Sequence, residues 1–397
     1  MFTAELENGE TISVWEREWE ELKSLRQHVS FYCPECKGKV ILKMGEKKIM
    51  HFAHKRGGGC ETNGEAESSY HLKGKLQLYD YLKRIGLSPK LEPYFSAIKQ
   101  RGDIGVVINN QYYVIEYQCS PISIDLLRKR TSGYFSINLL PIWIIGFKNM
   151  KNLTKSMLRL SIFSAQFITK YNQQYILPSY CPMQQKFYFF HSFFPVTINH
   201  FYCNCTAQSL RGLTSLPFAP KYQHTFPIEH WKQAIRKQKT HYIHYQTKKN
   251  QQFLKEIYPH KLHPHFLPPY MGIPLLSGIL IETPPLFWQT FIIIDNFSEE
   301  NKGKIVSFQK VLEHFYVRMD KQHIKLRKLP LTDDEGNWKQ AVFDYLQILV
   351  QLNIIQEIKP NFFLLQEEIA TDFHYQNQYL LEDEFYKKYI SILLARK

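Results

Sequence analysis

The amino-acid sequence predicts an α/β fold built around an αβββαβ core, and three observations support this class. Apolar residues recur at helical spacing across residues 65–85, which indicates a helix. Two runs rich in β-branched and aromatic residues flank Asn109 and Asn110, and this pattern indicates a β-hairpin. A second predicted helix at 124–134 precedes a further strand-like run at 139–147, so helices and strands alternate as they do in a mixed sheet covered by helices.

The length of the chain indicates how many domains it has, and its net charge indicates what kind of partner it binds. The chain has 397 residues, enough for two or three domains, and 44% of them are hydrophobic. Its formal net charge of +14 favours a polyanionic partner, most often a nucleic acid, with a merely basic surface as the alternative. We expect three parts: a cysteine-containing N-terminal segment at 1–62, the α/β core at 63–150, and a largely helical, basic and aromatic region at 151–397.

Nothing in the sequence indicates export or a membrane span. Residues 1–30 are charged and contain no apolar signal core. The uncharged stretch at 187–210 contains Pro195 and two histidines, and the apolar run at 271–281 is broken by Pro274. We therefore expect a cytoplasmic protein whose seven cysteines are thiols or metal ligands rather than disulfides.

Local signals predict the remaining elements of the core. Gly86 is a stop signal for the first helix, and residues 90–95 form a short strand. Ser123 is a candidate N-cap for the second helix, and Asp125 suits its first turn because acidic groups stabilise a helix N-terminus. A charged helical run at 15–26 precedes the cysteine-containing module.

The region after residue 150 is predicted to be mostly helical. Residues 151–220 combine a helix with short aromatic strands, and residues 306–325 have helical character. A helix at 337–352 is followed by two short β-rich runs within 354–365. A helix followed by a short hairpin is typical of the end of a winged helix, so we expect a winged-helix-like unit at the end of this region.

A small module between residues 31 and 60 is expected to be a zinc ribbon. Five candidate ligands lie in it: Cys33, Cys36, His51, His54 and Cys60. Zn²⁺ takes four such ligands in a tetrahedral structural site. Cys33, Cys36 and His54 are the first three choices, and the fourth place stays open between His51 and Cys60. Because so short a segment buries little apolar surface, the bound ion would supply folding energy.

Asp103 and Glu116 are the leading candidates for a second metal site. Asn tolerates positive φ, so Asn109 and Asn110 suit a two-residue turn. The register of such a turn places Asp103 across from Glu116, with Cβ atoms about 5 Å apart. Two opposed carboxylates repel unless a cation lies between them, which favours a metal site over ordinary surface charges. Gln118 lies two residues beyond Glu116 and shares its face of the strand.

The first predicted helix adds a third acidic group. Glu67, His71 and Lys75 follow one another at four-residue spacing and so share one face. With Asp103 and Glu116, Glu67 makes three carboxylates that can converge. Hard divalent ions such as Mg²⁺ and Mn²⁺ prefer oxygen ligands. Such a site suits phosphodiester hydrolysis, because the ion acidifies its bound water and stabilises charge on the leaving oxygen.

The strongest concentration of positive charge lies at residues 221–270. This segment contains nine Lys or Arg against two Glu, with Tyr, Phe and Trp interleaved. Cations that follow phosphates, combined with rings that stack on bases, are typical of single-strand nucleic-acid binding; a scattered basic surface is the alternative. The candidate DNA-binding residues are Lys232, Arg236, Lys237, Lys239, Lys248 and Lys249.

Taken together, these motifs resemble a known family. A helical acid at Glu67, an Asp after Gly at Asp103, and Glu116-x-Gln118 are similar to the pattern of PD-(D/E)XK nucleases, whose core is restriction-endonuclease-like. With the Cys-Pro-x-Cys and His-Phe-Ala-His motifs added, residues 1–147 resemble the competence protein CoiA family. The resemblance implies a divalent-metal-dependent deoxyribonuclease that processes incoming single-stranded DNA in natural transformation and promotes recombination. It also implies action alongside a RecA-type recombinase and a DprA-type DNA-processing protein.

The same resemblance implies roles for particular side chains. The three acids become the Mg²⁺ or Mn²⁺ ligands of a nuclease domain at 63–150. Arg130 and Tyr134, on the second predicted helix, become residues that support the acids. His71 is a further supporting candidate, with helix capping or packing as its alternative.

One departure from the nuclease pattern affects the expected activity. Gln118 stands where the pattern has Lys, and a neutral amide can only hydrogen-bond. Lys73 or Lys75 of the first helix can substitute for the missing charge. Otherwise the chain is a catalytically weak or inactive DNA-binding adaptor that assists recombinase loading. A Gly in place of the Pro of the pattern, at Gly102, is a minor difference.

Overall fold

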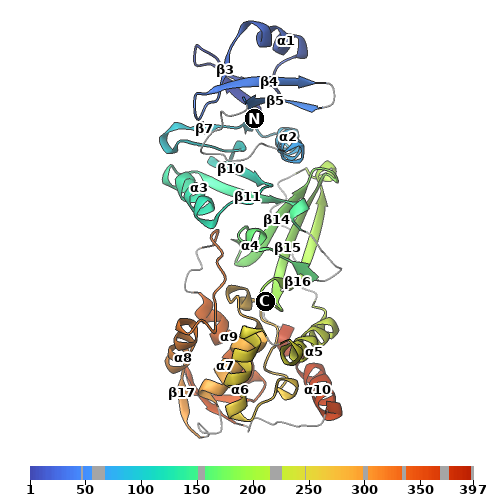
Figure 1. Cartoon of the computed structure of the whole chain (residues 1–397), viewed down its shortest axis with the longest axis vertical. Helices are drawn as coiled ribbons and strands as arrows, with labels where there is room; N and C mark the ends of the chain where they lie inside the picture. The colour runs from blue at the N-terminus through green and yellow to red at the C-terminus, as the bar shows by residue number, and fades with distance from the viewer. Residues whose placement is uncertain are drawn as a thin grey trace.

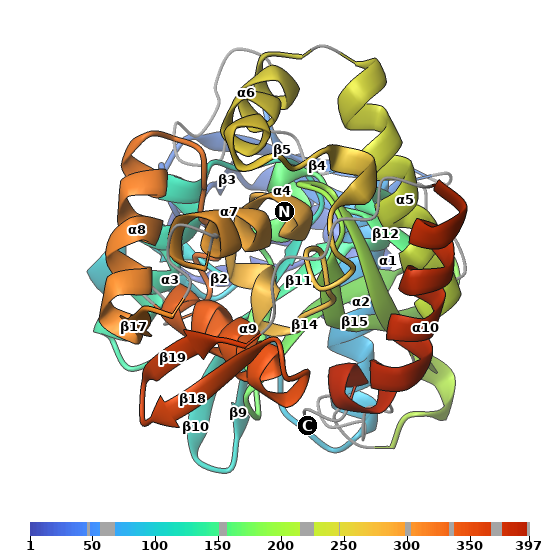
Figure 2. The same cartoon turned by 90° about the horizontal axis from the view of Figure 1, so that it is seen from below.

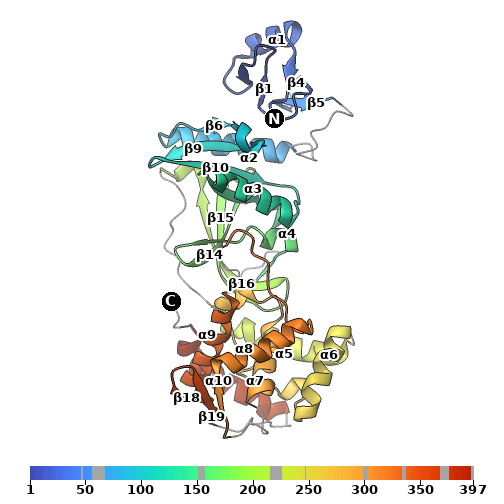
Figure 3. The ribbon, with the colours of Figure 1, turned by 90° about the vertical axis from the view of Figure 1, so that its left-hand side faces the viewer.

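The computed structural model describes residues 1–45, 48–55, 68–150, 157–214, 226–245, 247–297, 303–332, 337–366 and 375–394. These ranges form an elongated stack of three parts (Figure 1). A small β-rich module lies at one end, a mixed sheet with helices lies in the middle, and a helical region lies at the other end; Figure 3 shows the same order from the side. Every helix in the described ranges is too short or too polar to cross a bilayer.

The N-terminal module is larger than the expected ribbon and forms a five-stranded antiparallel sheet in the order β2-β1-β3-β4-β5. Its elements are β1 (Thr3–Glu5), β2 (Thr11–Ser13), α1 (Trp19–His28), β3 (Phe31–Tyr32), β4 (Lys39–Gly45) and β5 (Lys48–His54). Phe2 and Phe52 of the module share a hydrophobic core with Leu72 and Leu76 of the next helix. The module therefore packs against its neighbour and does not depend on a metal ion alone.

The middle part follows the predicted αβββαβ order. Its elements are α2 (Ser69–Arg84), β6 (Lys90–Leu91), β9 (Ile104–Ile108), β10 (Gln111–Gln118), α3 (Ile124–Ser136) and β11 (Leu140–Gly146). A small hairpin of β7 (Tyr94–Phe95) and β8 (Gln100–Arg101) is inserted between β6 and β9. β9 and β10 are antiparallel, whereas β10 and β11 are parallel because α3 crosses between them.

The local turn and cap predictions are confirmed. Asn109 and Asn110 both have positive φ, as a two-residue hairpin turn requires. The observed pairing of Ile104 with Ile115 has the predicted register. The side chain of Ser123 caps the N-terminus of α3. These contacts fix where β9 and β10 end and how α3 starts beside them.

The sheet does not end at β11. Its further strands are β12 (Met157–Arg159), β13 (Thr169–Tyr171), β14 (Gln174–Cys181), β15 (Lys186–Pro195) and β16 (His200–Ser209). The spatial order is β12-β16-β15-β14-β11-β10-β9-β6, with β13 paired to β14. The boundary expected at residue 150 therefore lies inside one continuous sheet. The aromatic strands expected within 151–220 are confirmed, and the helix among them is the short α4 (Ile162–Ala165).

The C-terminal part is helical. Its helices are α5 (Ile228–His244), α6 (Lys248–Ile257), α7 (Pro285–Asn296), α8 (Phe308–Asp320), α9 (Trp338–Gln351) and α10 (Tyr375–Leu394). Figure 2 shows α7 and α9 centrally, with α6, α8 and α10 around them. Almost every residue of α7 is buried, so this helix forms the centre of the C-terminal core.

The helix and hairpin predicted near the end of the chain are confirmed. β17 (Ile305–Ser307), β18 (Ile355–Lys359) and β19 (Phe362–Leu365) form a small sheet in the order β17-β19-β18. α9, which precedes the hairpin, buries Trp338, Tyr345 and Leu349 and carries a single cation, Lys339. Within the described residues, α9 therefore lacks the exposed basic face of a helix that reads DNA.

Gly74 allows α2 to approach β10 closely, and this gives a stability prediction. A Cβ at Gly74 would lie 2.2 Å from Cε1 of Tyr117, whose ring is buried. We predict that Gly74→Ala lowers the free energy of unfolding by about 1–3 kcal/mol in a urea titration, because overpacking outweighs the better helix propensity of Ala. Lys73→Ala, at the neighbouring and partly exposed position, is the control. Equal urea midpoints for Gly74→Ala and wild type would contradict this packing.

Candidate functional site

Asp103 lies just beyond the last residue pair of the β9–β10 ladder. Its carboxylate turns toward the backbone, where Oδ2 accepts a hydrogen bond from the Tyr117 N–H at 2.9 Å. Its own carbonyl accepts a hydrogen bond from the Glu92 N–H at 2.9 Å. The hairpin register thus brings Asp103 to the predicted end of the strand pair, and backbone donors and acceptors hold it there.

Two basic side chains of α2 reach the Asp103 carboxylate. Lys75 Nζ lies 2.9 Å from Oδ1, and His71 Nε2 lies 3.3 Å from Oδ2. The two residues are four apart and project from one face of α2. Lys75 is only 1% exposed, and its Nζ also donates to Glu92 Oε1 at 2.7 Å. Because a buried ammonium needs paired charges, Lys75 depends on both carboxylates.

Glu92 is a member of this cluster that the sequence analysis missed. It is buried, and its Oε2 accepts hydrogen bonds from the backbone N–H groups of Phe2 at 2.7 Å and Thr3 at 3.0 Å. Its φ of 47° is uncommon for a residue other than glycine. No local signal marks Glu92, because the backbone groups that it binds lie about 90 residues earlier in the chain.

Glu116 is buried beside α3. Arg130 Nη2 and the Tyr134 hydroxyl both donate to Glu116 Oε1. The Arg130 guanidinium also donates to the Arg101 carbonyl at 3.0 Å, which attaches α3 to the segment before Asp103. Burial raises the pKa of Glu116; Arg130 opposes this shift, and the nearby Asp103 adds to it. Both residues that the resemblance assigned as supports therefore contact the predicted acid.

Of the other two predicted acid-site residues, Gln118 turns away from the cluster and Glu67 is not described. The Gln118 side-chain amide donates to the Ser120 carbonyl at 2.7 Å, so it turns toward the loop after β10. Glu67 lies outside the described residues. In the part of the chain that the structure describes, no set of three His, Cys, Asp or Glu ligand atoms converges at this place. The described site thus contains the Asp103 and Glu92 carboxylates around Lys75, with His71 also at Asp103, and the Glu116 carboxylate paired with Arg130.

A second cluster lies in the N-terminal module. Cys33, Cys36 and His54 place their ligand atoms within 4.8 Å of one another, and Cys36 Sγ lies 3.3 Å from His54 Nε2. A tight turn between β3 and β4 presents the two cysteines. In this turn the Lys37 N–H donates to the Cys33 carbonyl at 2.9 Å, and Lys37 has positive φ. The three side chains can hold a metal ion.

His51 does not join this cluster, which corrects its place among the candidate ligands. His51 and His54 are three residues apart on β5, so their side chains project from opposite faces of the strand. His51 Nδ1 instead donates to the Ile49 carbonyl at 2.8 Å. Cys60, the other candidate for the fourth place, lies outside the described residues.

An ion pair connects the cysteine cluster to the acid site. Glu35, which stands between the two cysteines, places Oε1 3.6 Å from Arg101 Nε, and both side chains are nearly buried. Arg101 precedes Asp103 by two residues, and its carbonyl accepts the hydrogen bond from Arg130. The turn that carries the cysteines therefore packs against the segment that carries the acid.

Three of the six predicted DNA-binding residues form ion pairs within the protein. Lys239 Nζ lies 2.6 Å from a Glu382 oxygen, Arg236 Nε lies 2.7 Å from Glu382, and Lys232 Nζ lies 2.9 Å from Asp383. Both acids belong to α10, which packs along α5. Contrary to the expectation from the sequence, these three cations do not form an open basic surface, because α10 supplies acids that neutralise them.

The other three predicted DNA-binding residues, Lys237, Lys248 and Lys249, are exposed. Among the described side chains, none forms an ion pair with them. Their charges therefore remain available to an anionic partner.

A mixed sheet with two acids at one hairpin, flanked by helices that supply basic partners, defines a nuclease-like α/β protein. Residues 67–223 match the nuclease-like domain of competence protein CoiA, residues 14–63 match its N-terminal domain, and residues 226–379 match its C-terminal domain. The chain is 30% identical over 339 residues to competence protein CoiA of Bacillus subtilis (strain 168). The aligned residues cover 85% of this chain and 90% of that protein. The chain belongs to the competence protein CoiA family. No solved structure matches it.

The range of the nuclease-like match agrees with the sheet. The match continues past β11 and includes β14, β15 and β16, which end at Ser209. The late strands are therefore part of the nuclease-like domain and not of the helical region that follows.

The cysteine cluster gives a test of its fourth ligand. We predict that Cys60→Ser lowers bound metal from about one ion per chain and lowers the thermal midpoint, whereas His51→Gln keeps both, because His51 faces away from the cluster. Metal content is measured by plasma mass spectrometry after dialysis. Loss of the ion from His51→Gln but not from Cys60→Ser would reverse this assignment.

Proposed function

We propose that this protein is a divalent-metal-dependent deoxyribonuclease that processes incoming single-stranded DNA in natural transformation and thereby promotes recombination. One observation carries the proposal: Asp103 and Glu116 lie at adjacent strand ends, with Lys75 Nζ 2.9 Å from Asp103 Oδ1. Membership of a competence family supports the biological setting. The net charge of +14 supports a nucleic-acid partner. The order of elements supports a restriction-endonuclease-like core.

The donors of the acid site suit a hard cation such as Mg²⁺ or Mn²⁺, since carboxylate oxygens are its preferred ligands. The Asp103 side chain is 14% exposed. Both donors to Glu116 reach Oε1, and among the described residues no hydrogen bond reaches Oε2. Glu67, two residues before α2 in the sequence, is the proposed third ligand. A bound ion would acidify water and neutralise charge on the leaving oxygen.

We assign to Lys75 the positive charge that Gln118 does not supply. Lys75 comes from α2 instead of β10, yet its ammonium lies at the Asp103 carboxylate. An ammonium held there can stabilise the negative charge that develops on a phosphate during hydrolysis. Lys73, the other candidate, points toward Met183 at the surface. Arg130 balances the charge of the second acid.

We further propose that Cys33, Cys36 and His54, with Cys60, bind Zn²⁺ as a structural ion. Thiolate and imidazole ligands are typical of such sites. The ion would hold the turn whose Glu35 pairs with Arg101, and so would stabilise the acid site without taking part in the reaction. The proposed setting is the cytoplasm, alongside a RecA-type recombinase and a DprA-type DNA-processing protein.

A second candidate function is a DNA-binding adaptor that assists recombinase loading without cutting DNA. The contacts of Asp103 favour it. Oδ1 lies beside Lys75, and Oδ2 both accepts the Tyr117 N–H and lies beside His71, so protein groups contact both oxygens. The orientation of Gln118 also favours the adaptor. Its neutral amide donates to the Ser120 carbonyl, so β10 supplies no positive charge at the place where the nuclease pattern has Lys.

A cleavage assay separates the two functions. With Mg²⁺ or Mn²⁺, wild-type protein is expected to degrade labelled linear DNA, and Asp103→Asn is expected to slow single-turnover cleavage by about 100-fold or more, because one charge of the metal-binding pair is lost. Asp125→Asn, an exposed acid on α3, is the matched control and should cleave at the wild-type rate. Equal rates for wild type and Asp103→Asn would end the catalytic proposal.

DNA binding measured in the same samples identifies the adaptor. If wild-type protein does not cut but binds DNA with an affinity that falls steeply with salt, as counterion release requires, the adaptor function is the correct one. In that case Asp103→Asn should bind as the wild type does. Circular dichroism melts of each variant check that the fold is kept.

A further inference from the structure

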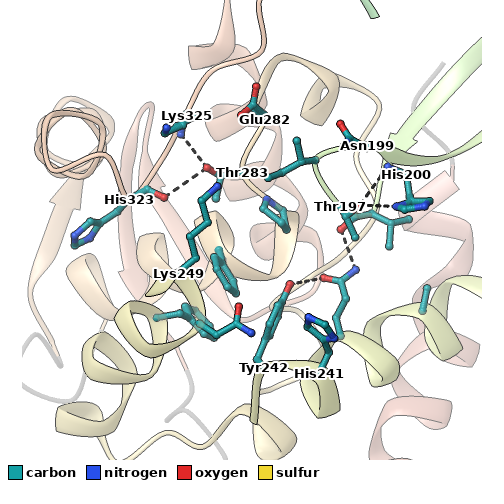
Figure 4. Close-up of a pocket in the computed structure, with 18 of the residues that line it drawn as sticks. Thr197, Asn199, His200, His241, Tyr242, Lys249, Glu282, Thr283, His323 and Lys325 are labelled. Carbon is teal, nitrogen blue, oxygen red and sulfur yellow. Dashed lines mark hydrogen bonds between the residues drawn. The ribbon is translucent and has the colours of Figure 1, made fainter. Parts of the chain in front are cut away.

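A large cavity lies between the far edge of the mixed sheet and the C-terminal helices. Its volume is about 590 Å³, within the range of about 300–1,000 Å³ that small-molecule sites occupy. β12 and the turn between β15 and β16 form one wall, and α5, α6, the start of α7 and residues 322–325 form the others (Figure 4). β12 is five strand spacings from β10, or about 24 Å, so this cavity is separate from the acid site.

The interior of the cavity is aromatic. Tyr242 of α5, Phe253 of α6 and Phe287 of α7 line it, and each is less than a tenth exposed. The rings of Phe253 and Phe287 stack with centroids 4.0 Å apart, and the Tyr242 ring lies 4.6 Å from that of Phe287. Such a wall suits a flat aromatic group.

The sheet side of the cavity adds groups that can hydrogen-bond to a base edge. Thr197 and Asn199 of the turn between β15 and β16, and His200 at the start of β16, line this side. Burial lowers the pKa of His200, and Arg159 lowers it further, which favours the neutral ring. Nδ1 of this ring already pairs with the Thr197 hydroxyl at 3.0 Å, so Nε2 of His200 and the Asn199 amide are the groups that can meet a base edge.

Four cations and one acid surround the cavity. Arg159, Lys237, Lys249 and Lys325 line it and are exposed, whereas Glu282 is the one carboxylate residue among its lining residues. In Figure 4, Lys249 extends from α6 toward the loop that carries Glu282. Within the described ranges none of the four cations forms an ion pair, in contrast to the cations of α5 that α10 neutralises. The cavity therefore attracts an anion.

We infer that this cavity binds one nucleotide of a single-stranded DNA, with the base against the aromatic wall and the adjacent phosphates on the cations. The inference rests on the proposed DNA-processing function and gives it a second contact point, away from the acid site. Aromatic rings for bases and cations for the backbone are the means by which proteins hold single strands. A duplex does not fit this arrangement, because its bases are already stacked and paired. An acyl chain would leave the four cations around the cavity unused.

Binding measured without added Mg²⁺ or Mn²⁺ tests this site separately from cleavage. The full-length wild-type chain should bind a fluorescent oligothymidylate, and the double variant Lys237→Glu with Lys249→Glu should bind at least about tenfold more weakly, because phosphate contacts are lost. The control double variant, Lys255→Glu with Lys328→Glu, reverses two exposed lysines outside the cavity. It should stay within about threefold of wild type.

A photocrosslink locates the bound base. An oligonucleotide that contains 4-thiothymidine should crosslink to peptides that carry Tyr242, Phe253 or Phe287. Crosslinks found only elsewhere, or equal affinities for the two double variants, would overturn the inference. Free dTMP that binds as tightly as the oligonucleotide would also overturn it, because the site would then take a free nucleotide. A protein that binds and crosslinks as expected but never cuts would refute the nuclease and leave this site in place.

Discussion

The buried ammonium of Lys75 connects three segments that are far apart in the chain. Its Nζ contacts Asp103 at the end of the hairpin and Glu92 in the loop after β6. Glu92 in turn accepts hydrogen bonds from the backbone of Phe2 and Thr3 in the N-terminal module. Removing one partner of such a buried pair typically costs about 3–5 kcal/mol, because a charge is left unpaired. The positions of the module, of α2 and of the acid site therefore depend on one another.

The N-terminal module is thus part of the candidate site and not an appended domain. It contacts the acid cluster twice, through the backbone bonds to Glu92 and through the ion pair of Glu35 with Arg101. The second contact starts from the turn that presents Cys33 and Cys36, so a metal ion bound there would influence the segment before Asp103. This gives a physical reason for a metal-binding module and an acid site to occur in one chain.

The basic charge of the C-terminal part has two distinct uses. Lys232, Arg236 and Lys239 are spaced by four and three residues on α5, so they share the face that α10 covers with acids. Lys237 lies on another face of the same helix and, with Lys249 of α6, borders the aromatic cavity. One group of cations therefore attaches helices to each other, and the other group remains open to an anion.

Features that depend on nearby residues follow from the sequence. Residue type and spacing specify the Asn109 turn, the β9–β10 register, the Ser123 cap and the proximity of the Cys33 and Cys36 thiols. The aromatic composition also indicates strands after β11, but not that they extend the same sheet, because that depends on the pairing of β14 with β11. The role of Glu92 and the neutralisation of the α5 cations depend on contacts across about 90 and 143 residues. Such contacts are set by how whole elements pack, which residue spacing does not encode.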